Sequence, residues 1–258
     1  MSKLRFLGVG AGQCQTLGCS SAVFEHAHTR LLIDCGHGSL QRYLERYTTL
    51  PQFIYITHLH YDHIADLQAL FYQARFNSEP NNRPQLFIAA ALVPKLVHMF
   101  DQESAALAEG NCNMWQWIQL IPVTQGFWLN QHYFKIYPTR HHAPNSCFSL
   151  HLPGVFFYSA DTRPVPEIIH HALSGSETIF HDCRLCANPS HTGLDDLPRE
   201  YVPEAIERLV LYHYLSEQEG RDMQAKGYQI ATPNQLFDLS PLAIASTQTV
   251  TPINKITL

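Results

Sequence analysis

The 258-residue sequence contains no long hydrophobic run and no surplus of positive charge. None of its apolar stretches approaches the roughly 18 residues that a membrane-spanning helix needs. Its first residues, MSKLRFLGVGAG, lack the apolar segment and the small-residue cleavage site of a signal peptide. Lys and Arg total 17 against 22 Asp and Glu, so the formal net charge of -5 provides no overall attraction to nucleic acid, although a local basic groove is compatible with it. We therefore expect a cytoplasmic protein that does not enter the membrane.

The sequence also lacks the cysteine pattern of a disulfide-stabilised protein. Its seven cysteines are an odd number and irregularly spaced. Cys183 and Cys186 form a Cys-x-x-Cys pair, which could be redox-active or half of a zinc site, but reduced and partly buried thiols are the simpler interpretation. Hydrophobic residues at 45% and charged residues at 15% are typical of a globular protein with a substantial core. The unusual feature is histidine, with 16 residues against 17 Lys plus Arg.

Short apolar segments rich in β-branched and aromatic residues recur along the chain at strand length. They are RLLIDCG, QFIYITH, QLFIAAA, IQLIPV, HYFKIYPT, CFSLHL, GVFFYSAD, ETIFHDC and RLVLYHY. Helical patterns cover residues 64–74, PREYVPEAIERL and SEQEGRDMQAKG, and a polar loop is expected at Asn77–Gln85. Strands precede the helices in groups of two to four, which favours layered sheets flanked by helices over a strict βαβ repeat. No repeat or linker divides the chain, so we expect one domain, residues 1–258.

The densest group of potential metal ligands lies in THLHYDHI, where three histidines and an aspartate fall within residues 58–63. On an extended segment the side chains of His58 and His60 point to the same side, and Asp62 and His63 follow where a helix should begin. An active zinc ion has tetrahedral ligands with one position left open, so this cluster alone would under-fill two metals. The missing ligands are expected at the ends of other strands, where the candidates are His141, His142, Asp161 and His213.

With these ligands in place, the sequence resembles the metallo-β-lactamase superfamily, and within it the ribonuclease Z-like branch, over nearly the whole chain. HLHYDH matches the H-x-H-x-D-H signature of that superfamily residue for residue, and this signature is highly specific. FLGVGAG resembles the family's opening strand and glycine turn, and LLIDCGHG resembles its Asp-x-Gly-x-Gly turn at Asp34, Gly36 and Gly38. The resemblance implies a four-layer αββα sandwich of the α/β class. It also implies a hydrolase with two divalent metal ions, for which zinc is the default and manganese or iron are alternatives.

The resemblance assigns each ligand to a metal. The first metal would be held by His58, His60 and His141, the second by Asp62, His63 and His213, and Asp161 would bridge both. His141 is preferred over His142 because the family's ligand stands seven residues before an aromatic residue, here Phe148. His142 would then support the ligands or form part of the wall of the site.

Two further segments bear on the reaction. FHDCRL, with His181 and Asp182, resembles the His-Glu-Ala-Thr stretch of ribonuclease Z, with Asp in place of Glu. SHTGLDDL, with His191 and Thr192, resembles its His-Ser-Thr stretch, in which the histidine contacts the scissile phosphate. We therefore expect Asp62 to orient the attacking water, and His191 to donate to the phosphate or leaving group. Asp182 or His181 would orient His191. The alternative interpretation is that His191 is an ordinary loop histidine with no role in the reaction.

One difference from the ribonuclease Z proteins narrows the range of expected substrates. Ribonuclease Z proteins that process tRNA carry a glycine- and proline-rich insertion that grips the tRNA, and the chain has no room for it between Ser149 and Thr178. A small nucleotide or a short RNA phosphodiester is therefore the expected substrate. A thioester, lactone or lactam hydrolase of the same fold would not need His191, and a non-catalytic metal- or nucleotide-binding module would be expected to have lost ligands. A homodimer is a fair expectation for such folds.

Overall fold

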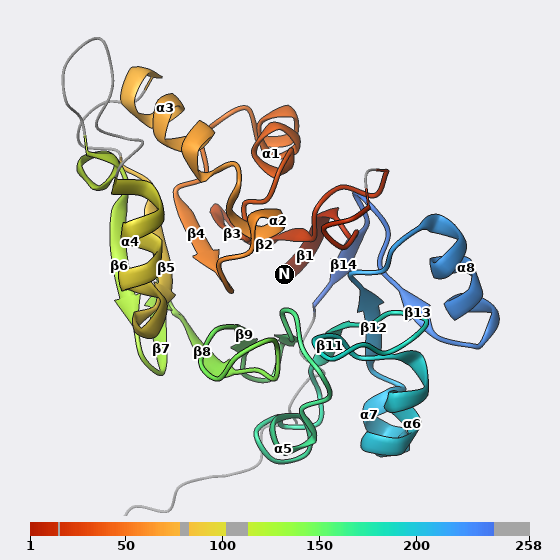
Figure 1. Ribbon diagram of the computed structural model, residues 1–258. Helices are drawn as coiled ribbons and strands as arrows, with labels where there is room; N and C mark the ends of the chain where they lie inside the picture. Colours follow the sequence, from red (N-terminus) through yellow and green to blue (C-terminus); the bar gives the residue numbers. More distant parts are fainter. Residues whose placement is uncertain (15, 78–82, 102–112, 240–258) are drawn as a thin grey trace, which may run out of the picture.

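Two β-sheets packed face to face form the centre of the computed structural model, which describes residues 1–14, 16–77, 83–101 and 113–239 (Figure 1). The first sheet has the order β14-β1-β2-β3-β4-β5-β6. Its strands are β1 (Ser2–Gly8), β2 (Ser21–His26), β3 (Thr29–Ile33), β4 (Phe53–Ile56), β5 (Gln85–Ala89), β6 (Gln119–Val123) and β14 (Leu236–Asp238). The pairs from β3 to β6 are parallel, whereas β14, β1, β2 and β3 pair antiparallel.

The second sheet has the order β13-β12-β11-β10-β9-β8-β7. Its strands are β7 (Gly126–Leu129), β8 (His132–Pro138), β9 (Phe148–Leu152), β10 (Phe156–Tyr158), β11 (Thr178–Asp182), β12 (Leu209–Tyr212) and β13 (Gln229–Ile230). The pairs from β10 to β13 are parallel, and those from β7 to β10 are antiparallel. Both sheets are therefore mixed.

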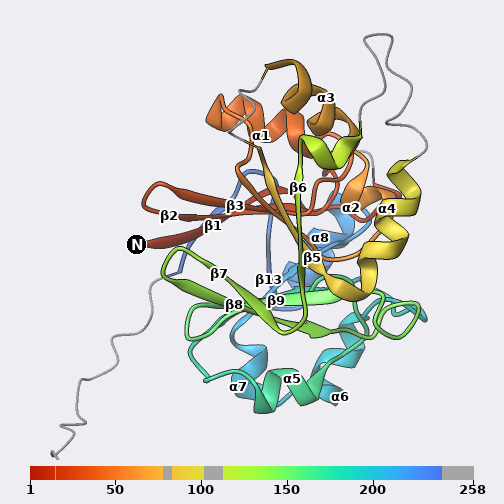
Figure 2. The same cartoon turned by 90° about the vertical axis from the view of Figure 1, so that its left-hand side faces the viewer.

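Helices cover the outer faces of the two sheets (Figure 2). On the side of the first sheet lie α1 (Ser39–Tyr47), α2 (Tyr61–Ile64), α3 (Leu67–Asn77) and α4 (Val93–Asp101). On the side of the second sheet lie α5 (Pro166–His171), α6 (Leu197–Glu200) and α7 (Pro203–Ile206), while α8 (Glu217–Ala225) packs against β13. Short 3-10 helices occupy Ala90–Leu92, Met114–Gln116 and Leu194–Asp196. The predicted four-layer αββα arrangement is confirmed.

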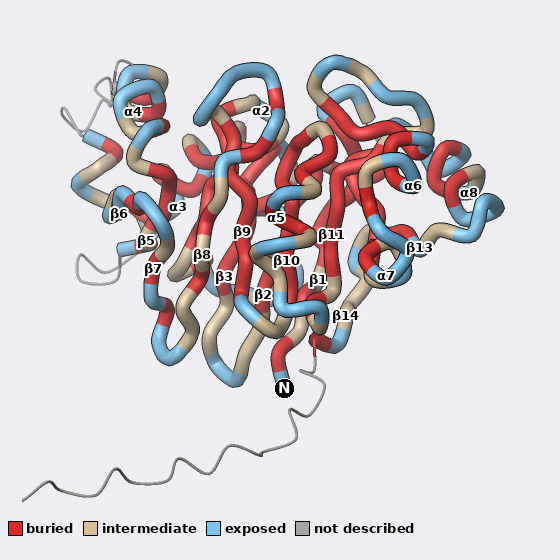
Figure 3. Tube along the Cα trace, turned by 90° about the horizontal axis from the view of Figure 1, so that it is seen from below, coloured by how far each residue is buried: buried red, intermediate tan, exposed pale blue. Residues whose placement is uncertain are grey.

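Aromatic side chains from both sheets fill the space between them. The ring of Phe6 on β1 lies 5.4 Å from that of Phe180 on β11 and 5.5 Å from that of Tyr212 on β12. Phe24 on β2 contacts Phe134 on β8 at 5.4 Å in the same way. Each buried Phe side chain stabilises the fold by roughly 1.5–3 kcal/mol. The central strands are accordingly buried, with β9, β10 and β12 buried along their whole length (Figure 3).

The nine predicted strand segments all contain observed strands, but two predicted helices are interrupted. Residues 64–74 divide into α2 and α3 because the chain turns at Asp66, whose backbone N–H donates to Cys35 O and whose side chain accepts from Leu40 N. PREYVPEAIERL divides into α6 and α7 at Val202, which is extended (φ -70°, ψ 153°). Pro203 follows Val202, and the helical conformation is disfavoured for a residue that precedes proline.

Three expectations from the sequence are only partly addressed by the described residues. Most of the predicted polar loop Asn77–Gln85 lies outside them, and the single domain over residues 1–258 stays a prediction. A search of the described residues finds no helix that is both long and apolar enough to cross a bilayer.

Candidate metal centre

The predicted ligands follow strands that end at one edge of the sandwich. His58 comes two residues after β4, and His213 directly follows β12. His141 comes three residues after β8, and Asp161 comes three residues after β10. Backbone contacts join the two sheets at this edge: a bridge between His58 and Cys147, with a 3.0 Å hydrogen bond from Phe148 N to Thr57 O, and a 2.7 Å hydrogen bond from His213 N to Val9 O. Side chains from both sheets therefore meet in one place.

The first group of ligand atoms comprises three histidine nitrogens and one carboxylate. His60 Nδ1 lies 3.1 Å from His58 Nε2 and 3.1 Å from His141 Nε2. Asp161 Oδ2 lies 3.6 Å from His58 Nε2 and 3.9 Å from His141 Nε2. All four atoms lie within 4.8 Å of one another, as the ligands of one metal ion would.

The second group uses the same oxygen of Asp161. Its separations are 3.5 Å to His63 Nε2 and 3.4 Å to His213 Nε2. Asp62 Oδ2 lies 3.4 Å from His63 Nε2 and 3.6 Å from His213 Nε2. Tetrahedral bonds of about 2.0–2.2 Å to zinc place neighbouring ligand atoms roughly 3.3–3.6 Å apart. The second group therefore has the spacing of a zinc site, with Asp161 at the boundary of the two groups.

Buried polar atoms in the second group also lack hydrogen-bond partners. His63 Nε2, His213 Nε2 and Asp161 Oδ1 are all enclosed without one. Leaving such atoms unpaired in a protein interior costs free energy, so each needs an explanation. Metal coordination would satisfy them, and imidazole and carboxylate are suitable ligands for zinc and for manganese or iron. The residues thus fit two divalent ions.

Asp34 orients two of the histidines from behind. Its carboxylate is fully buried and lies 2.8 Å from His63 Nδ1. The Thr57 hydroxyl donates to the same carboxylate at 2.8 Å and lies 3.0 Å from His58 Nδ1. When Nδ1 donates a hydrogen bond, Nε2 keeps its lone pair for a metal, which is the usual role of such carboxylates. From the sequence, Asp34 is predicted only as part of the Asp-x-Gly-x-Gly turn, without a role in orienting the histidines.

Of the two adjacent histidines after β8, only His141 faces the cluster. Its side chain is 1% exposed, and its Nδ1 lies 3.0 Å from Ser190 O, which leaves Nε2 directed at His60. His142 is exposed, and its ring stacks on that of His60 at 4.7 Å and 24°. This geometry supports His141 as the proposed ligand.

The charges of the cluster suit metal binding. Burial lowers the pKa of His58 well below its usual value and that of His60 to about 4, so both are neutral near pH 7. Burial alone would lower the pKa of His63 and His213, but Asp161 and its neighbours raise that of His63 well above normal and that of His213 to about 10. Burial would likewise raise the pKa of Asp161, but the surrounding histidines lower it well below its usual range. In metal-free protein, protons on His63 and His213 thus balance the carboxylates.

Asp182 connects His191 to the cluster. His191 Nδ1 donates to Asp182 Oδ2 at 2.8 Å, and the backbone N–H of Thr162 donates to the same oxygen at 2.8 Å. The other oxygen, Oδ1, lies 3.3 Å from His213 Nδ1. The rings of His191 and His213 stack at 4.9 Å and 25°. Asp182 rather than His181 is the residue that contacts His191, because the buried His181 ring lies against Tyr201 Oη at 2.7 Å.

The loop that carries His191 is fastened by a residue that the sequence analysis did not identify. Arg163 donates from Nη1 to His191 O at 2.8 Å and forms a 2.6 Å ion pair with the buried Asp196. Asp196 also accepts from Gly193 N at 2.9 Å. Arg163 and Asp196 are far apart in the sequence, so no local sequence pattern predicts this ion pair.

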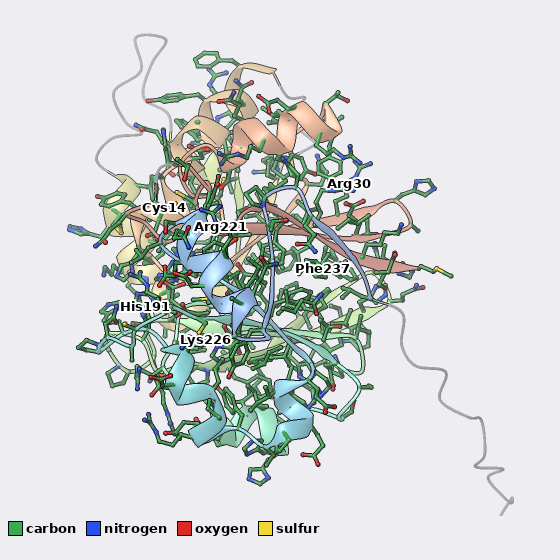
Figure 4. The ribbon with its side chains drawn as sticks, turned by 90° about the vertical axis from the view of Figure 1, so that its right-hand side faces the viewer. Cys14, Arg30, His191, Arg221, Lys226 and Phe237 are labelled. Carbon is green, nitrogen blue, oxygen red and sulfur yellow. The ribbon has the colours of Figure 1, made fainter. Side chains whose placement is uncertain are left out.

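A glycine loop after β1 lies against Asp62. A Cβ atom on Gly12 would be 2.8 Å from Asp62 Oδ2 and 3.0 Å from its Cγ, closer than such atoms approach. Cys14 in this loop and His191 lie toward the same edge of the sandwich (Figure 4). The Cys-x-x-Cys pair is not part of the metal cluster. Cys183 is buried and donates to Arg184 O, whereas Cys186 is exposed. The metal-capable groups found among the described residues contain no cysteine.

Comparison with known proteins places this chain beside one family. A family model described as "Anti-Pycsar protein Apyc1" matches residues 2–237. The anti-Pycsar protein Apyc1 of Paenibacillus harenae is 27% identical over 244 residues, which cover 84% of this chain and 93% of that protein.

Three solved structures resemble this protein over more than nine-tenths of the chain. They are the metallo-β-lactamase fold protein YhfI from Bacillus subtilis (TM-score 0.70, 16% identity, covering 92% of this chain and 100% of that one), a diphosphatase from the PhnP family (0.73, 17%, 93% and 99%) and the short form of human tRNase Z (0.64, 17%, 92% and 99%). At these identities the likeness establishes the fold, which is the metallo-β-lactamase fold predicted from the H-x-H-x-D-H signature.

Proposed function

This chain belongs to the family described as anti-Pycsar protein Apyc1, and from that premise we propose that it is a two-metal phosphodiesterase whose substrates are small nucleotides. The family's description as anti-Pycsar favours a cyclic nucleotide. The observation that carries the proposal is the position of His191, held by Asp182 at 2.8 Å and stacked on the ligand His213. A hydrolase of thioesters or lactones would use the same metal ligands but would not need this histidine.

The proposed reaction divides its tasks among the residues of the cluster. Bound metal ions would supply an activated water and would stabilise charge on the phosphate oxygens. The Asp62 carboxylate, 17% exposed, is placed to orient that water. His191 donates from Nδ1 to Asp182, so its Nε2 is available to donate a hydrogen bond or proton to the phosphate or leaving oxygen.

The chain between β9 and β11 supports a small substrate. β9 and β10 are joined by a tight turn at Gly154, and only residues 159–165 separate β10 from α5, so the described residues contain no arm here that could hold a tRNA. Together with the formal net charge of -5, this favours a compact phosphodiester over a large polyanion.

The proposal is tested by hydrolysis of bis(p-nitrophenyl) phosphate and of 3′,5′-cyclic nucleotides by zinc- and manganese-loaded protein. Asp62→Ala should abolish turnover, and His191→Ala should reduce kcat on the order of 10²- to 10⁴-fold if His191 acts as a general acid. His171→Ala is a matched control, because His171 is an exposed histidine on α5. Unchanged turnover of 3′,5′-cyclic nucleotides in His191→Ala would refute the role of His191 as a general acid. Hydrolysis of thioesters or lactones without hydrolysis of either phosphodiester would refute the phosphodiesterase proposal and favour the alternative reaction.

A further inference from the structure

A cavity of about 450 Å³ lies along residues 138–145, the segment that connects β8 to the metal cluster. Its lining includes Pro138, Arg140, His142, Ala143, Pro144 and Asn145. The ligand His141 lines it as well, so the cavity adjoins the first group of metal ligands. Its volume is within the range of pockets that bind small molecules.

The segment that forms the cavity is held at both ends and in the middle. Thr139 N donates to Cys147 O at 2.9 Å, which closes the base of the loop. Arg140 O accepts from Arg163 N at 2.8 Å, and the Ser146 hydroxyl donates to Ala143 O at 2.6 Å. A site that is already ordered avoids much of the entropic cost of binding, so this cavity is suited to a ligand as it stands.

His142 presents an aromatic ring to this cavity. The ring stacks on that of His60 at 4.7 Å and 24° and meets that of His141 edge-on at 4.9 Å and 84°. These contacts fix one side of the ring against two metal ligands, while the residue as a whole is exposed and lines the cavity. A second planar ring can therefore continue the stack.

The chemistry of the lining favours an uncharged planar ligand over a second phosphate. The guanidinium of Arg140 is already engaged, with Nη2 donating to Glu167 Oε2 at 3.0 Å and Nη1 to Pro164 O at 3.0 Å. Besides Arg140 and the ligand His141, the lining consists of Pro and Ala side chains, His142 for stacking, and Thr139 and the Asn145 amide as polar groups. Apolar walls with a few polar groups are typical of sites for heteroaromatic rings.

We infer that this cavity receives the nucleobase of the substrate, stacked on His142, while the phosphodiester lies at the metal cluster. The inference rests on the proposed function and adds a specificity site to it. The His142 ring directly contacts the rings of His60 and His141, so a base stacked on its outer face would lie near the metal cluster, and in a nucleotide only one sugar ring separates the base from the phosphate. Base stacking tolerates any base, so the site would admit purines and pyrimidines.

The test compares two substrates that differ only in the base. One is 3′,5′-cyclic AMP, and the other is methyl ribofuranoside 3′,5′-cyclic phosphate, which carries a methoxy group in place of adenine. Loss of a stacking platform typically reduces affinity roughly 5- to 150-fold. His142→Ala should therefore raise KM for cyclic AMP by that factor with little change in kcat, because uniform binding is lost. KM for the base-free substrate should change less than about twofold, and His142→Phe should restore most of the affinity for cyclic AMP.

Two controls keep the outcomes distinct. Tyr61 is another ring beside the cluster, 72% exposed, and His171 is an exposed histidine on α5. A selective KM rise in Tyr61→Ala but not in His142→Ala would overturn the assignment of the base to this cavity. Equal effects of His142→Ala on both substrates, or an effect no larger than that of His171→Ala, would overturn it too. Wild-type protein that is metal-loaded yet hydrolyses neither substrate would instead overturn the proposed function, and the base site with it.

Discussion

Replacing Asp182 with asparagine should damage metal binding and catalysis together, because one buried carboxylate serves two histidines. Its Oδ2 accepts from His191 Nδ1 at 2.8 Å, and its Oδ1 lies 3.3 Å from His213 Nδ1. Asparagine has only one carbonyl oxygen. Thr162 N also donates to the Oδ2 position, so the carbonyl should settle there and the amide NH₂ should face His213. Two donors would then oppose each other, which favours the tautomer of His213 with its proton on Nε2.

The magnitude follows from the two contacts separately. Loss of an orienting partner behind a metal-bound histidine usually lowers metal affinity 10- to 100-fold, equivalent to about 1.4–2.7 kcal/mol at the His213 site. Misorientation of His191 should lower kcat at saturating metal, up to the roughly 10²- to 10⁴-fold expected for removal of a general acid. Since asparagine can still accept from His191, the effect on kcat should be smaller than that of His191→Ala.

The assay separates these effects by measuring zinc affinity against a competing chelator, and kcat at saturating zinc. Asp182→Glu is the matched control, because it restores the carboxylate and is the residue expected in the ribonuclease Z stretch. A double variant, Asp182→Asn with His191→Ala, should be no slower at saturating metal than His191→Ala alone if Asp182 acts on kcat through His191. Wild-type zinc affinity in Asp182→Asn would refute the account of His213, and additive losses of kcat in the double variant would refute the account of His191.

Two further predictions concern the neighbours of the second metal group. Gly12→Ala should lower kcat about 10- to 100-fold, because the added Cβ would lie 2.8 Å from Asp62 Oδ2 and displace this proposed ligand. A kcat within twofold of wild type would contradict this prediction. The pKa values of His63 and His213 are raised in the metal-free protein, so both side chains are protonated at pH 7. Zinc binding at pH 7 should therefore release about two protons, and zinc affinity should increase with pH. Calorimetry in buffers of different ionisation enthalpy measures this release, and a value near zero would show that the two histidines are neutral.

The parts of the site that the sequence could predict are those set by local chemistry. His58, His60, Asp62 and His63 lie within six residues, and that density has few explanations other than metal binding. Asp161 and His213 directly terminate or follow apolar segments, so their positions at strand ends could be predicted as soon as the strands were. The same local signals, apolar runs of strand length, predict layered sheets flanked by helices, whereas the four-layer αββα sandwich is predicted from the resemblance to the metallo-β-lactamase superfamily.

The parts that the sequence could not predict depend on contacts between distant segments. Arg163 holds the His191 loop through Asp196, and the stack of His142 on His60 joins residues more than 80 positions apart. Neither pair leaves a periodic or motif signal. The break of the helical pattern at Asp66 is similar, because it follows from hydrogen bonds to Cys35 and Leu40 on another segment.

The placement of the ligands links the packing of the two sheets to the formation of the site. The segment after β4 of the first sheet, a short loop followed by α2, carries four of the proposed ligands, and loops after β8, β10 and β12 of the second sheet carry the other three, namely His141, Asp161 and His213. Neither sheet alone holds a complete set for either metal, because Asp161 is shared by both groups. Binding therefore requires the packed sandwich, and a ligand that binds only the folded state stabilises it by about 4 kcal/mol at 1,000 times its Kd. His63 Nε2, His213 Nε2 and Asp161 Oδ1 are buried without hydrogen-bond partners at the interface of the two sheets, which lowers the stability of the metal-free protein. Metal binding would remove this destabilisation.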